Sequence, residues 1–310
     1  MLLVTGATGF VGRSLVARAL MCDGISVRAA VRTATHGLPS AVEIARIGDV
    51  SETTDWTQAL AGADVVVHLA ARVHVMRDAA ADPLAEFRRV NVAGTLQLAR
   101  SAARAGSRRF VYLSSVKVNG EGGDTPYRET DPPSPRDPYG VSKHEAETGL
   151  RALAAETGLE VVIIRPPLVY GPGVKGNFRS LMRLVARGVP LPFGAVHNCR
   201  SLVGLDNLVD LILTCVRRPQ AANETFLVSD GNDLSTTQLI RELAYAMGKS
   251  PRLIPVPASA LGAAAALLGK RGVAQRLLGS LQVDISKARL TLGWQPPNTV
   301  QDGLRQAVRG

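Results

Sequence analysis

The stretch Thr5-Gly6-Ala7-Thr8-Gly9-Phe10-Val11-Gly12 follows a short apolar run, Leu2–Thr5, and opens a segment with helical spacing, Phe10–Met21. In this pattern the first glycine permits a tight turn, the second lets a pyrophosphate approach the backbone, and the third lets the helix pack closely on the strand. Free amide N–H groups and the helix dipole at the start of the helix attract negative charge. We therefore predict a dinucleotide-binding loop whose cofactor-binding residues are Gly6, Gly9, Phe10, Val11 and Gly12.

Strand and helix patterns alternate outward from this loop through the first half of the chain. Further apolar runs predict strands at Ser26–Val31, Val42–Ile47, Asp64–Leu69, Arg109–Leu113 and Glu160–Ile164. Helical patterns lie between them at Asp55–Leu60, Pro83–Ala105 and Pro138–Thr157. Continuous Val, Ile and Leu strands with crossover helices indicate a parallel sheet covered on both faces. The predicted fold is α/β, with a doubly wound parallel sheet of the Rossmann type.

The pattern changes after Arg165-Pro166-Pro167, where Gly and Pro become frequent and helices then dominate. We expect a dinucleotide-binding domain over residues 1–166, to which the chain returns at about 203–233. A smaller, helix-rich C-terminal substrate lobe is expected from residues 167–202 and 234–310. Helices are predicted in this lobe at Phe178–Arg187, Thr236–Met247, Ser259–Leu278 and Val300–Val308. The returning chain is predicted to form a helix at Asp206–Val216 and a strand at Thr225–Val228.

The composition excludes several classes of protein. The 310 residues carry a formal net charge of +10, but the basic residues are spread along the chain and only 4% of residues are aromatic, so no nucleic-acid partner is expected. Cys22, Cys199 and Cys215 form no C-x-x-C pair, which argues against a metal site or a disulfide framework. The longest apolar run, Ala258–Leu268, is shorter than the ~20 residues of a membrane span, and the start of the chain does not resemble a signal peptide. We expect a cytoplasmic protein.

The end of the second predicted strand bears on the choice of cofactor. It reads Val27-Arg28-Ala29-Ala30-Val31-Arg32 and lacks a carboxylate that could bond the ribose 2′-hydroxyl of NAD. A guanidinium suits a 2′-phosphate, so Arg32 is a predicted ligand and NADP(H) is favoured, with NAD(H) possible. The alternative is that Arg28 and Arg32 are solvated surface charges. Asp49 and Val50, which follow the third strand, are expected near the adenine, and small residues after the fourth strand would let the cofactor lie flat: Leu69, Ala70 and Ala71.

The segment Tyr139-Gly140-Val141-Ser142-Lys143 places a phenol and an ammonium four residues apart on one face of a predicted helix. The unperturbed pKa of tyrosine, about 10, is too high for a general base at neutral pH. A nearby lysine favours the phenolate and is expected to lower that pKa. Ser115, at the end of the fifth predicted strand, could hydrogen-bond the same substrate oxygen. The predicted catalytic residues are Ser115, Tyr139 and Lys143.

Several motifs together make the chain resemble the extended short-chain dehydrogenase/reductase family, which comprises NAD(P)-dependent nucleotide-sugar epimerases, dehydratases and reductases. The motifs are T-G-x-x-G-x-x-G at 5–12, Asp49, His68-Leu69-Ala70-Ala71, Asn91-Val92-x-Gly94-Thr95, Ser114-Ser115, the Tyr139/Lys143 pair and Arg165-Pro166-x-x-Val169-Tyr170-Gly171-Pro172. The resemblance spans nearly the whole chain.

This resemblance implies roles for particular residues. Tyr139 would be the acid/base, Lys143 would bind the nicotinamide ribose and tune Tyr139, and Ser115 would orient the reacting oxygen. Further cofactor contacts would come from Tyr139 itself, Pro166 and Val169. Asn177 and Arg200 would lie near the substrate diphosphate, and His74 and Lys117 would line the sugar pocket. The implied substrate is a nucleotide-sugar, with UDP as the expected nucleotide, and the implied assembly is a homodimer.

The two residues that follow Ser115 bear on which of the family's reactions the protein catalyses. Dehydratases of the family carry an Asp-Glu pair there, whereas this chain has Val116 and Lys117, so dehydration is not expected. The resemblance to bacterial enzymes of surface-polysaccharide synthesis favours reduction at C4 of a UDP-linked 4-keto-6-deoxy-N-acetylhexosamine. The alternative is a UDP-hexose or UDP-N-acetylhexosamine 4-epimerase. A non-catalytic NADP-binding sensor is more remote, because Tyr139 and Lys143 are both present.

Overall fold

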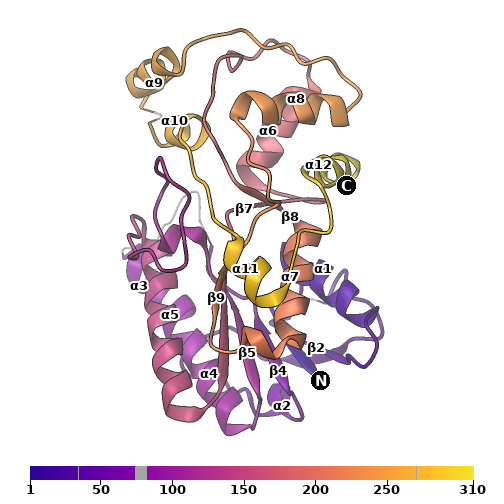
Figure 1. Cartoon of the computed structure of the whole chain (residues 1–310). Coiled ribbons are helices and arrows are strands. Elements are labelled where there is room, and N and C mark those ends of the chain that lie inside the picture. Colours follow the sequence, from indigo (N-terminus) through magenta and orange to yellow (C-terminus); the bar gives the residue numbers. More distant parts are fainter. Residues whose placement is uncertain (34, 74–81, 270) are drawn as a thin grey trace.

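The computed structural model describes residues 1–33, 35–73, 82–269 and 271–310. Its centre is a seven-stranded sheet in which every pairing is parallel, with strand order β3-β2-β1-β4-β5-β6-β9 (Figure 1). This confirms the predicted doubly wound α/β fold. The strands are β1 Leu2–Thr5, β2 Val27–Val31, β3 Glu43–Arg46, β4 Val65–His68, β5 Arg109–Leu113, β6 Glu160–Arg165 and β9 Thr225–Leu227.

Helices cover both faces of this sheet because successive side chains of each strand point to opposite sides. Leu2 and Val4 of β1 pack into a core with helices α1, α7 and α11, whereas Leu3 between them packs into a second core with α2, α4 and α5. The strand order reverses between β1 and β4, and ligands bind in such sheets at the carboxyl ends of the strands beside the reversal. The helices are α1 Phe10–Leu20, α2 Thr57–Leu60, α4 Thr95–Arg104, α5 Pro138–Thr157, α7 Leu205–Arg217 and α11 Ser286–Leu292.

Helix α5 has clear start and stop signals in its sequence. The Asp137 side chain caps the N-terminus by accepting the N–H of Gly140 at 2.7 Å, and Pro138 occupies the first turn, where its missing N–H costs nothing. Gly158 ends the helix with a left-handed φ of 74°. By contrast, the helix predicted over Pro83–Ala105 is interrupted: α3 Pro83–Arg88 passes into a π-helical turn, Arg89–Gly94, before α4 begins.

The remaining elements form a helix-rich region at the other end of the molecule (Figure 1). A third core, which includes Tyr170, Phe178, Leu243 and Leu304, holds together a two-stranded parallel sheet and three helices. These elements are β7 Leu168–Tyr170, β8 Leu202–Gly204, α6 Gly176–Ala186, α8 Thr236–Ala246 and α12 Val300–Arg309.

The helix predicted over Ser259–Leu278 is instead two helices, α9 Ala258–Leu267 and α10 Arg271–Leu278. Gly269, with φ +67°, lies after the end of α9 and explains why that helix stops. Among the described residues, no helix has both the length and the apolar character that crossing a bilayer requires.

Candidate active site

The glycine loop after β1 is packed so tightly that its glycines cannot be replaced. Gly6 has φ +66°, and a Cβ there would lie 2.7 Å from the backbone nitrogen of Ala70. A Cβ on Gly12 would lie 2.2 Å from the carbonyl oxygen of Gly6. Because Phe10 and Val11 occupy the first turn of α1, their amides have no carbonyl partner within the helix. These amides at the carboxyl edge of the sheet fit the diphosphate of a dinucleotide.

A buried histidine connects the two strands beside this loop. His68 Nδ1 lies 2.7 Å from Thr5 Oγ1, and its Nε2 lies 3.0 Å from Thr95 Oγ1. Burial, with a smaller effect of Lys143, lowers the pKa of His68 to about 3, so the ring is neutral. The ring joins the ends of β1 and β4 to α4, which fixes the position of Leu69, Ala70 and Ala71 beside the loop.

The two arginines that favoured NADP(H), Arg28 on β2 and Arg32 just after it, have different surroundings. Arg28 is buried and its guanidinium already has partners, because it donates to Glu43 Oε1 at 2.8 Å and to the carbonyls of Ala59 and Ala61. Arg32 is exposed, and its guanidinium lies 3.4 Å from the Asp49 carboxylate, which is also exposed. These two predicted cofactor residues therefore form an ion pair on the surface. Val50 next to Asp49 is buried, and its Cγ1 lies 2.7 Å from where a Cβ on Gly94 would be.

Lys143 lies within reach of Tyr139, as the four-residue spacing predicted. Its Nζ is 5.8 Å from the centre of the Tyr139 ring and 4.4 Å from that of Tyr112, and it donates to the carbonyl of Leu113 at 2.8 Å. The side chain is buried, and burial lowers the pKa of Lys143 to about 7, against the opposing effect of the Glu147 carboxylate. Near neutral pH this amine is therefore close to its titration point.

The expected lowering of the Tyr139 pKa is wrong for the groups that the chain itself provides. Burial, and then the Asp137 carboxylate, raise the pKa of Tyr139 above its ordinary value. Lys143 does not reverse this, because burial disfavours its own charged form. The Tyr139 ring is half-buried and packs edge-on against Phe87, with ring centres 6.1 Å apart. The chain alone thus holds this phenol protonated.

The two serines after β5 have different surroundings. Ser114 is buried and donates to the Glu147 carboxylate at 2.6 Å, whereas Ser115 is half-buried and its Oγ accepts the backbone N–H of Lys117 at 3.3 Å. The Ser115 hydroxyl proton thus stays available to a ligand. The turn that follows, Val116–Val118, is tied to the end of β6, since Val116 donates to the carbonyl of Pro166 at 3.0 Å.

The predicted substrate residues fall in three places. Lys117 Nζ bonds the Asp137 carboxylate and lies 3.2 Å from Glu121 Oε1, so it joins the loop of Ser115 to the start of α5. Arg200 donates to the carbonyl of Gly279 at 2.9 Å, and burial lowers the pKa of its guanidinium against the opposing effect of the Glu121 carboxylate. Of the other two predicted substrate residues, Asn177 is exposed in the first turn of α6 and His74 lies outside the described residues. Val169, a predicted cofactor residue, is half-buried on β7.

Two buried polar groups were not predicted, although they hold the catalytic candidates in place. Glu147 accepts from Arg165 Nε at 2.9 Å and Nη2 at 2.6 Å, and these bonds, with those from Ser114 and Arg151, outweigh burial and lower its pKa. Asn91, in the π-helical turn, donates to Ser142 Oγ at 3.0 Å. Glu147 follows Lys143 by four residues on α5, so the same spacing argument could have found it. Asn91 stands in the motif Asn91-Val92-x-Gly94-Thr95 that carries the family resemblance, which marked its position but gave it no role.

Asn91 connects the segment after β4 to the catalytic helix. Its side chain accepts the N–H of Arg72 at 2.8 Å and donates to the carbonyl of Arg72 at 3.0 Å. Ser142 in turn donates to the carbonyl of Tyr139 at 2.8 Å. A displacement of the chain at Arg72 would therefore change the position of Tyr139 through Asn91 and Ser142.

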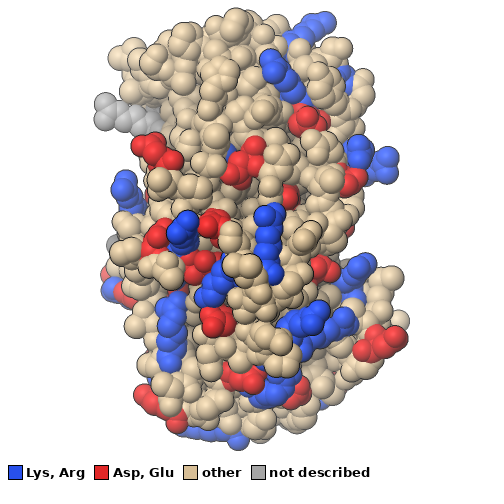
Figure 2. Space-filling view, viewed as in Figure 1, with Lys and Arg blue, Asp and Glu red and all other residues tan. Residues whose placement is uncertain are grey.

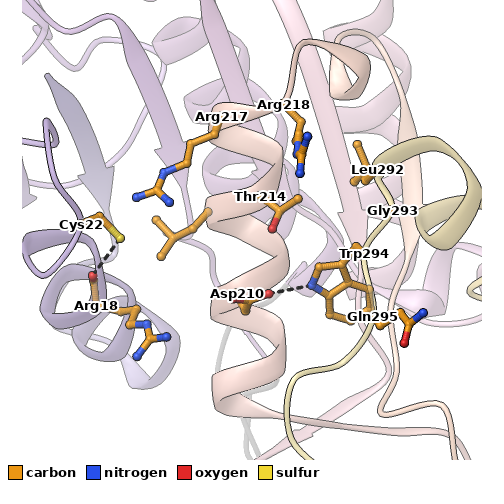
Figure 3. A pocket seen from close by; sticks show the side chains of 11 residues that line it. Arg18, Cys22, Asp210, Thr214, Arg217, Arg218, Leu292, Gly293, Trp294 and Gln295 are labelled. Carbon is orange, nitrogen blue, oxygen red and sulfur yellow. Dashed lines mark hydrogen bonds between the residues drawn. The ribbon is translucent and has the colours of Figure 1, made fainter.

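A separate hollow of about 530 Å³ lies on the outer face of α7, between α1 and residues 292–295 (Figure 3). The described residues that line it include none of the predicted catalytic residues. Its carboxylate, Asp210, already accepts from Trp294 Nε1 at 2.8 Å. This hollow is not part of the site built around Ser115, Tyr139 and Lys143. No group of His, Cys, Asp or Glu within the described ranges could hold a metal ion.

Comparison with known proteins agrees with this geometry. The sequence model of the "NAD dependent epimerase/dehydratase family" matches residues 2–229. A Vibrio cholerae protein named UDP-glucose 4-epimerase is 50% identical over 99% of this chain and 94% of its own length. An Escherichia coli O157:H7 protein named N-acetyl-alpha-D-glucosaminyl-diphospho-ditrans,octacis-undecaprenol 4-epimerase is 30% identical over 99% and 94%. The solved structure of MoeE5 with UDP-glucose and NAD is 27% identical, with a TM-score of 0.78 over 99% of this chain and 97% of that one.

These matches confirm the predicted class of enzyme and correct two finer predictions. The resemblance to 4-reductases is not confirmed, because the two relatives above are named 4-epimerases. The preference for NADP(H) is not supported, because the matching family is NAD dependent and the similar structure contains NAD. With the parallel sheet, the glycine loop and the Tyr139/Lys143 pair in place, the chain belongs to the NAD dependent epimerase/dehydratase family, a family of extended short-chain dehydrogenases/reductases.

Proposed function

We propose that the protein is an NAD-dependent 4-epimerase of a UDP-hexose or a UDP-N-acetylhexosamine. The observation that carries this proposal is the position of Lys143 Nζ, which lies 5.8 Å from the centre of the Tyr139 ring and donates to the carbonyl of Leu113, two residues before Ser115. It is supported by the 50% identity of the chain to a protein named UDP-glucose 4-epimerase. The reductase prediction depended on an exchangeable NADP(H), and Arg28 is not available to hold its phosphate. A 4-epimerase needs no net reductant, which suits a retained NAD.

We assign cofactor binding to the residues around the strand reversal. Phe10 and Val11 would hold the diphosphate through their amides, and the neighbouring backbone excludes side chains at Gly6 and Gly12. The remaining proposed contacts are Gly9, Arg32, Asp49, Val50, Leu69, Ala70, Ala71, Tyr139, Lys143, Pro166 and Val169. We further propose that residues 1–166, with the return at 203–233, bind the cofactor, and that 167–202 and 234–310 bind the sugar-nucleotide. A homodimer stays a prediction.

In the proposed mechanism Tyr139 transfers the proton, Ser115 donates a hydrogen bond to the reacting oxygen, and Lys143 positions the cofactor. When bound, NAD⁺ supplies the hydride acceptor and a positive ring. Tyr139 Oη takes the proton of the C4 hydroxyl as that carbon becomes a ketone, and Ser115 Oγ donates to the same oxygen. The pKa of Tyr139 is raised by burial and by Asp137, so ionisation of the phenol awaits added positive charge. Once the 4-keto sugar has rotated to present its opposite face, C4 would take the hydride back on that face while Tyr139 Oη returns the proton to the oxygen, which gives the opposite epimer.

Lys143 has a positioning task in this scheme. Its Nζ donates one hydrogen bond to the carbonyl of Leu113. A charged ammonium has three N–H donors, so two more can bond other groups. We propose that one of these bonds a ribose hydroxyl of the cofactor. Because the pKa of Lys143 is about 7, small changes in its surroundings alter its charge at neutral pH.

A second candidate substrate is a hexosamine carried on a polyprenyl diphosphate, as in the name of the Escherichia coli relative. Two leucines at the end of α9 that are largely exposed to solvent favour this candidate, because they offer an apolar surface on the same lobe. Both candidates carry the sugar on a diphosphate, so the chemistry at C4 would be the same.

The test is to incubate the purified protein with UDP-glucose and with UDP-N-acetylglucosamine, without added coenzyme, and to follow the sugar by NMR. Interconversion with the corresponding galacto sugar supports the proposal. Stoichiometric oxidation of added NADPH by a UDP-4-keto-6-deoxy sugar, with no interconversion, would establish the reductase instead. The polyprenyl diphosphate sugar in detergent is the third arm of the experiment.

A further inference from the structure

Helix α9 is apolar on all sides, yet the structure buries none of its residues. It reads ASALGAAAAL and packs against α10, but every residue from Ala258 to Leu267 keeps appreciable contact with solvent. A helix that is apolar all round is normally covered, either by protein or by lipid. At ten residues it is too short to cross a bilayer, which takes ~20. The fold thus leaves an apolar element that needs a cover from outside.

Large apolar side chains mark the end of this helix. Leu267 is 90% exposed and Leu268 is 72% exposed, and Val273 on α10 is half exposed. In Figure 1, α9 and α10 lie together at one corner of the molecule, at the end away from the central sheet. In the view of Figure 2 the surface over α9 is largely without charged side chains. We call Leu267, Leu268 and Val273 the apolar tip.

The charge of the surrounding chain indicates what covers the apolar tip. Residues 243–283 contain no Asp or Glu and five basic residues: Lys249, Arg252, Lys270, Arg271 and Arg276. Basic residues beside an exposed apolar element are the composition of segments that lie on anionic membranes. A second copy of the same segment would bring ten like charges together and is a poor partner. The observations therefore favour a negatively charged surface with an apolar interior.

We propose that α9 and α10 dock the protein on anionic phospholipid bilayers, with the apolar tip inserted at the level of the headgroups. This docking goes beyond the proposed 4-epimerase activity and does not depend on it. It would also bring the substrate lobe close to the bilayer. After α10 the chain runs directly into Gly279, whose carbonyl accepts from Arg200, and then into Leu281, whose carbonyl accepts from the N–H of Ser201.

The experiment is co-sedimentation of the full chain with vesicles of phosphatidylcholine, with and without phosphatidylglycerol. We expect the bound fraction to be ~10-fold larger on the anionic vesicles. This fraction should fall as the salt concentration rises, because screening weakens the attraction between the basic residues and the anionic lipids. The double variant Leu267→Glu/Leu268→Glu should lose this binding. Leu290→Glu is the matched control, since Leu290 on α11 is 86% exposed but lies outside the segment.

Each alternative result has a definite meaning. Equal sedimentation of wild type and the double variant, or no sedimentation with either vesicle, would overturn the proposal. So would a concentration-dependent dimer in analytical ultracentrifugation that the double variant abolishes, because the apolar tip would then be covered by a second copy. Circular dichroism of both variants separates a folding defect from lost docking. If the double variant does not fold, Arg276→Glu, an exposed reversal of charge on α10, provides the same comparison.

Discussion

Ser114 and Ser115 are adjacent in the chain, but their hydroxyls have opposite kinds of partner. The Ser114 hydroxyl donates to a buried carboxylate, that of Glu147, at 2.6 Å. The Ser115 hydroxyl accepts the backbone N–H of Lys117 at 3.3 Å, at the start of the turn Val116–Val118. A bond to a buried charge stabilises the fold, whereas a hydroxyl that only accepts keeps its proton for a ligand. Proximity in sequence therefore does not make the two serines equivalent.

This difference predicts opposite effects of two alanine variants. Ser115→Ala should lower kcat by about 10²–10³-fold, the typical loss when a donor to the reacting oxygen is removed, without changing stability. Ser114→Ala should keep most of the activity but lower the free energy of unfolding by about 1.5–3 kcal/mol, because it removes a hydrogen bond to a charged group. Steady-state kinetics and urea denaturation of both variants make the comparison. A larger loss of kcat in Ser114→Ala, at unchanged stability, would reverse the assignment.

Removing the phenol oxygen of Tyr139 isolates its proposed role. Tyr139→Phe should reduce turnover by ~10²-fold or more, because general acid–base catalysis contributes at least that much. It should leave NAD binding nearly unchanged, since the ring and its contact with Phe87 are kept. Titration of NAD by calorimetry, beside a turnover assay, measures both. Tyr245→Phe, on the exposed face of α8, is the control and should behave as wild type. Retained turnover in Tyr139→Phe would refute the assigned role.

The cofactor preference can be tested at the two arginines of the second strand. Arg32 and Asp49 form an exposed ion pair at 3.4 Å, and such pairs contribute about 0–1 kcal/mol to the free energy of unfolding. Since the Arg32 side chain is exposed to solvent, Arg32→Ala should change the affinity for NAD less than about tenfold. Arg28→Ala should instead lower stability by about 2 kcal/mol, because its buried carbonyl partners lose their donor. Titrating NAD and NADP against wild type and both variants decides the matter. Tighter binding of NADP by wild type, lost in Arg32→Ala, would restore the original prediction.

The sequence predicted the central sheet well because most of its strands are buried, with the largely exposed edge strand β3 as the exception. Continuous apolar runs gave the bounds of β1 and β5 to the residue, and the Asp-Pro start of α5 marked that helix equally well. The three-residue strands β7 and β8 were missed, whereas β9, which is equally short, was predicted. The break between α9 and α10 was missed too, although Gly269 and the Lys270-Arg271 pair interrupt the apolar pattern and Gly269 adopts a left-handed conformation.

The site could be predicted only where its residues share one local element. Tyr139 and Lys143 lie on one turn of α5, so their spacing alone placed them together. Arg28 was misjudged because its partners come from other elements: the Glu43 carboxylate lies on β3, and the carbonyls lie in and after α2. The effect of Asp137 on Tyr139 likewise depends on the depth at which the start of α5 is buried. Such contacts between distant segments leave no spacing to detect.

Lys143 should make the folded chain less stable near neutral pH, and this effect has a defined pH dependence. Burial lowers its pKa to about 7 from the ordinary 10.5, so between these values the unfolded chain holds a proton that the folded chain has released. The free energy of unfolding of wild type should therefore rise with pH across this window. Lys143→Met removes that contribution, so its stability relative to wild type should be greatest at pH 7 and decline toward pH 10, while turnover is lost. Urea denaturation at intervals of pH measures the difference. Lys287→Met, which removes a partly exposed lysine paired with Glu224, is the control for the loss of a lysine outside the site. A difference between Lys143→Met and wild type that does not change with pH would mean that Lys143 stays charged in the folded chain.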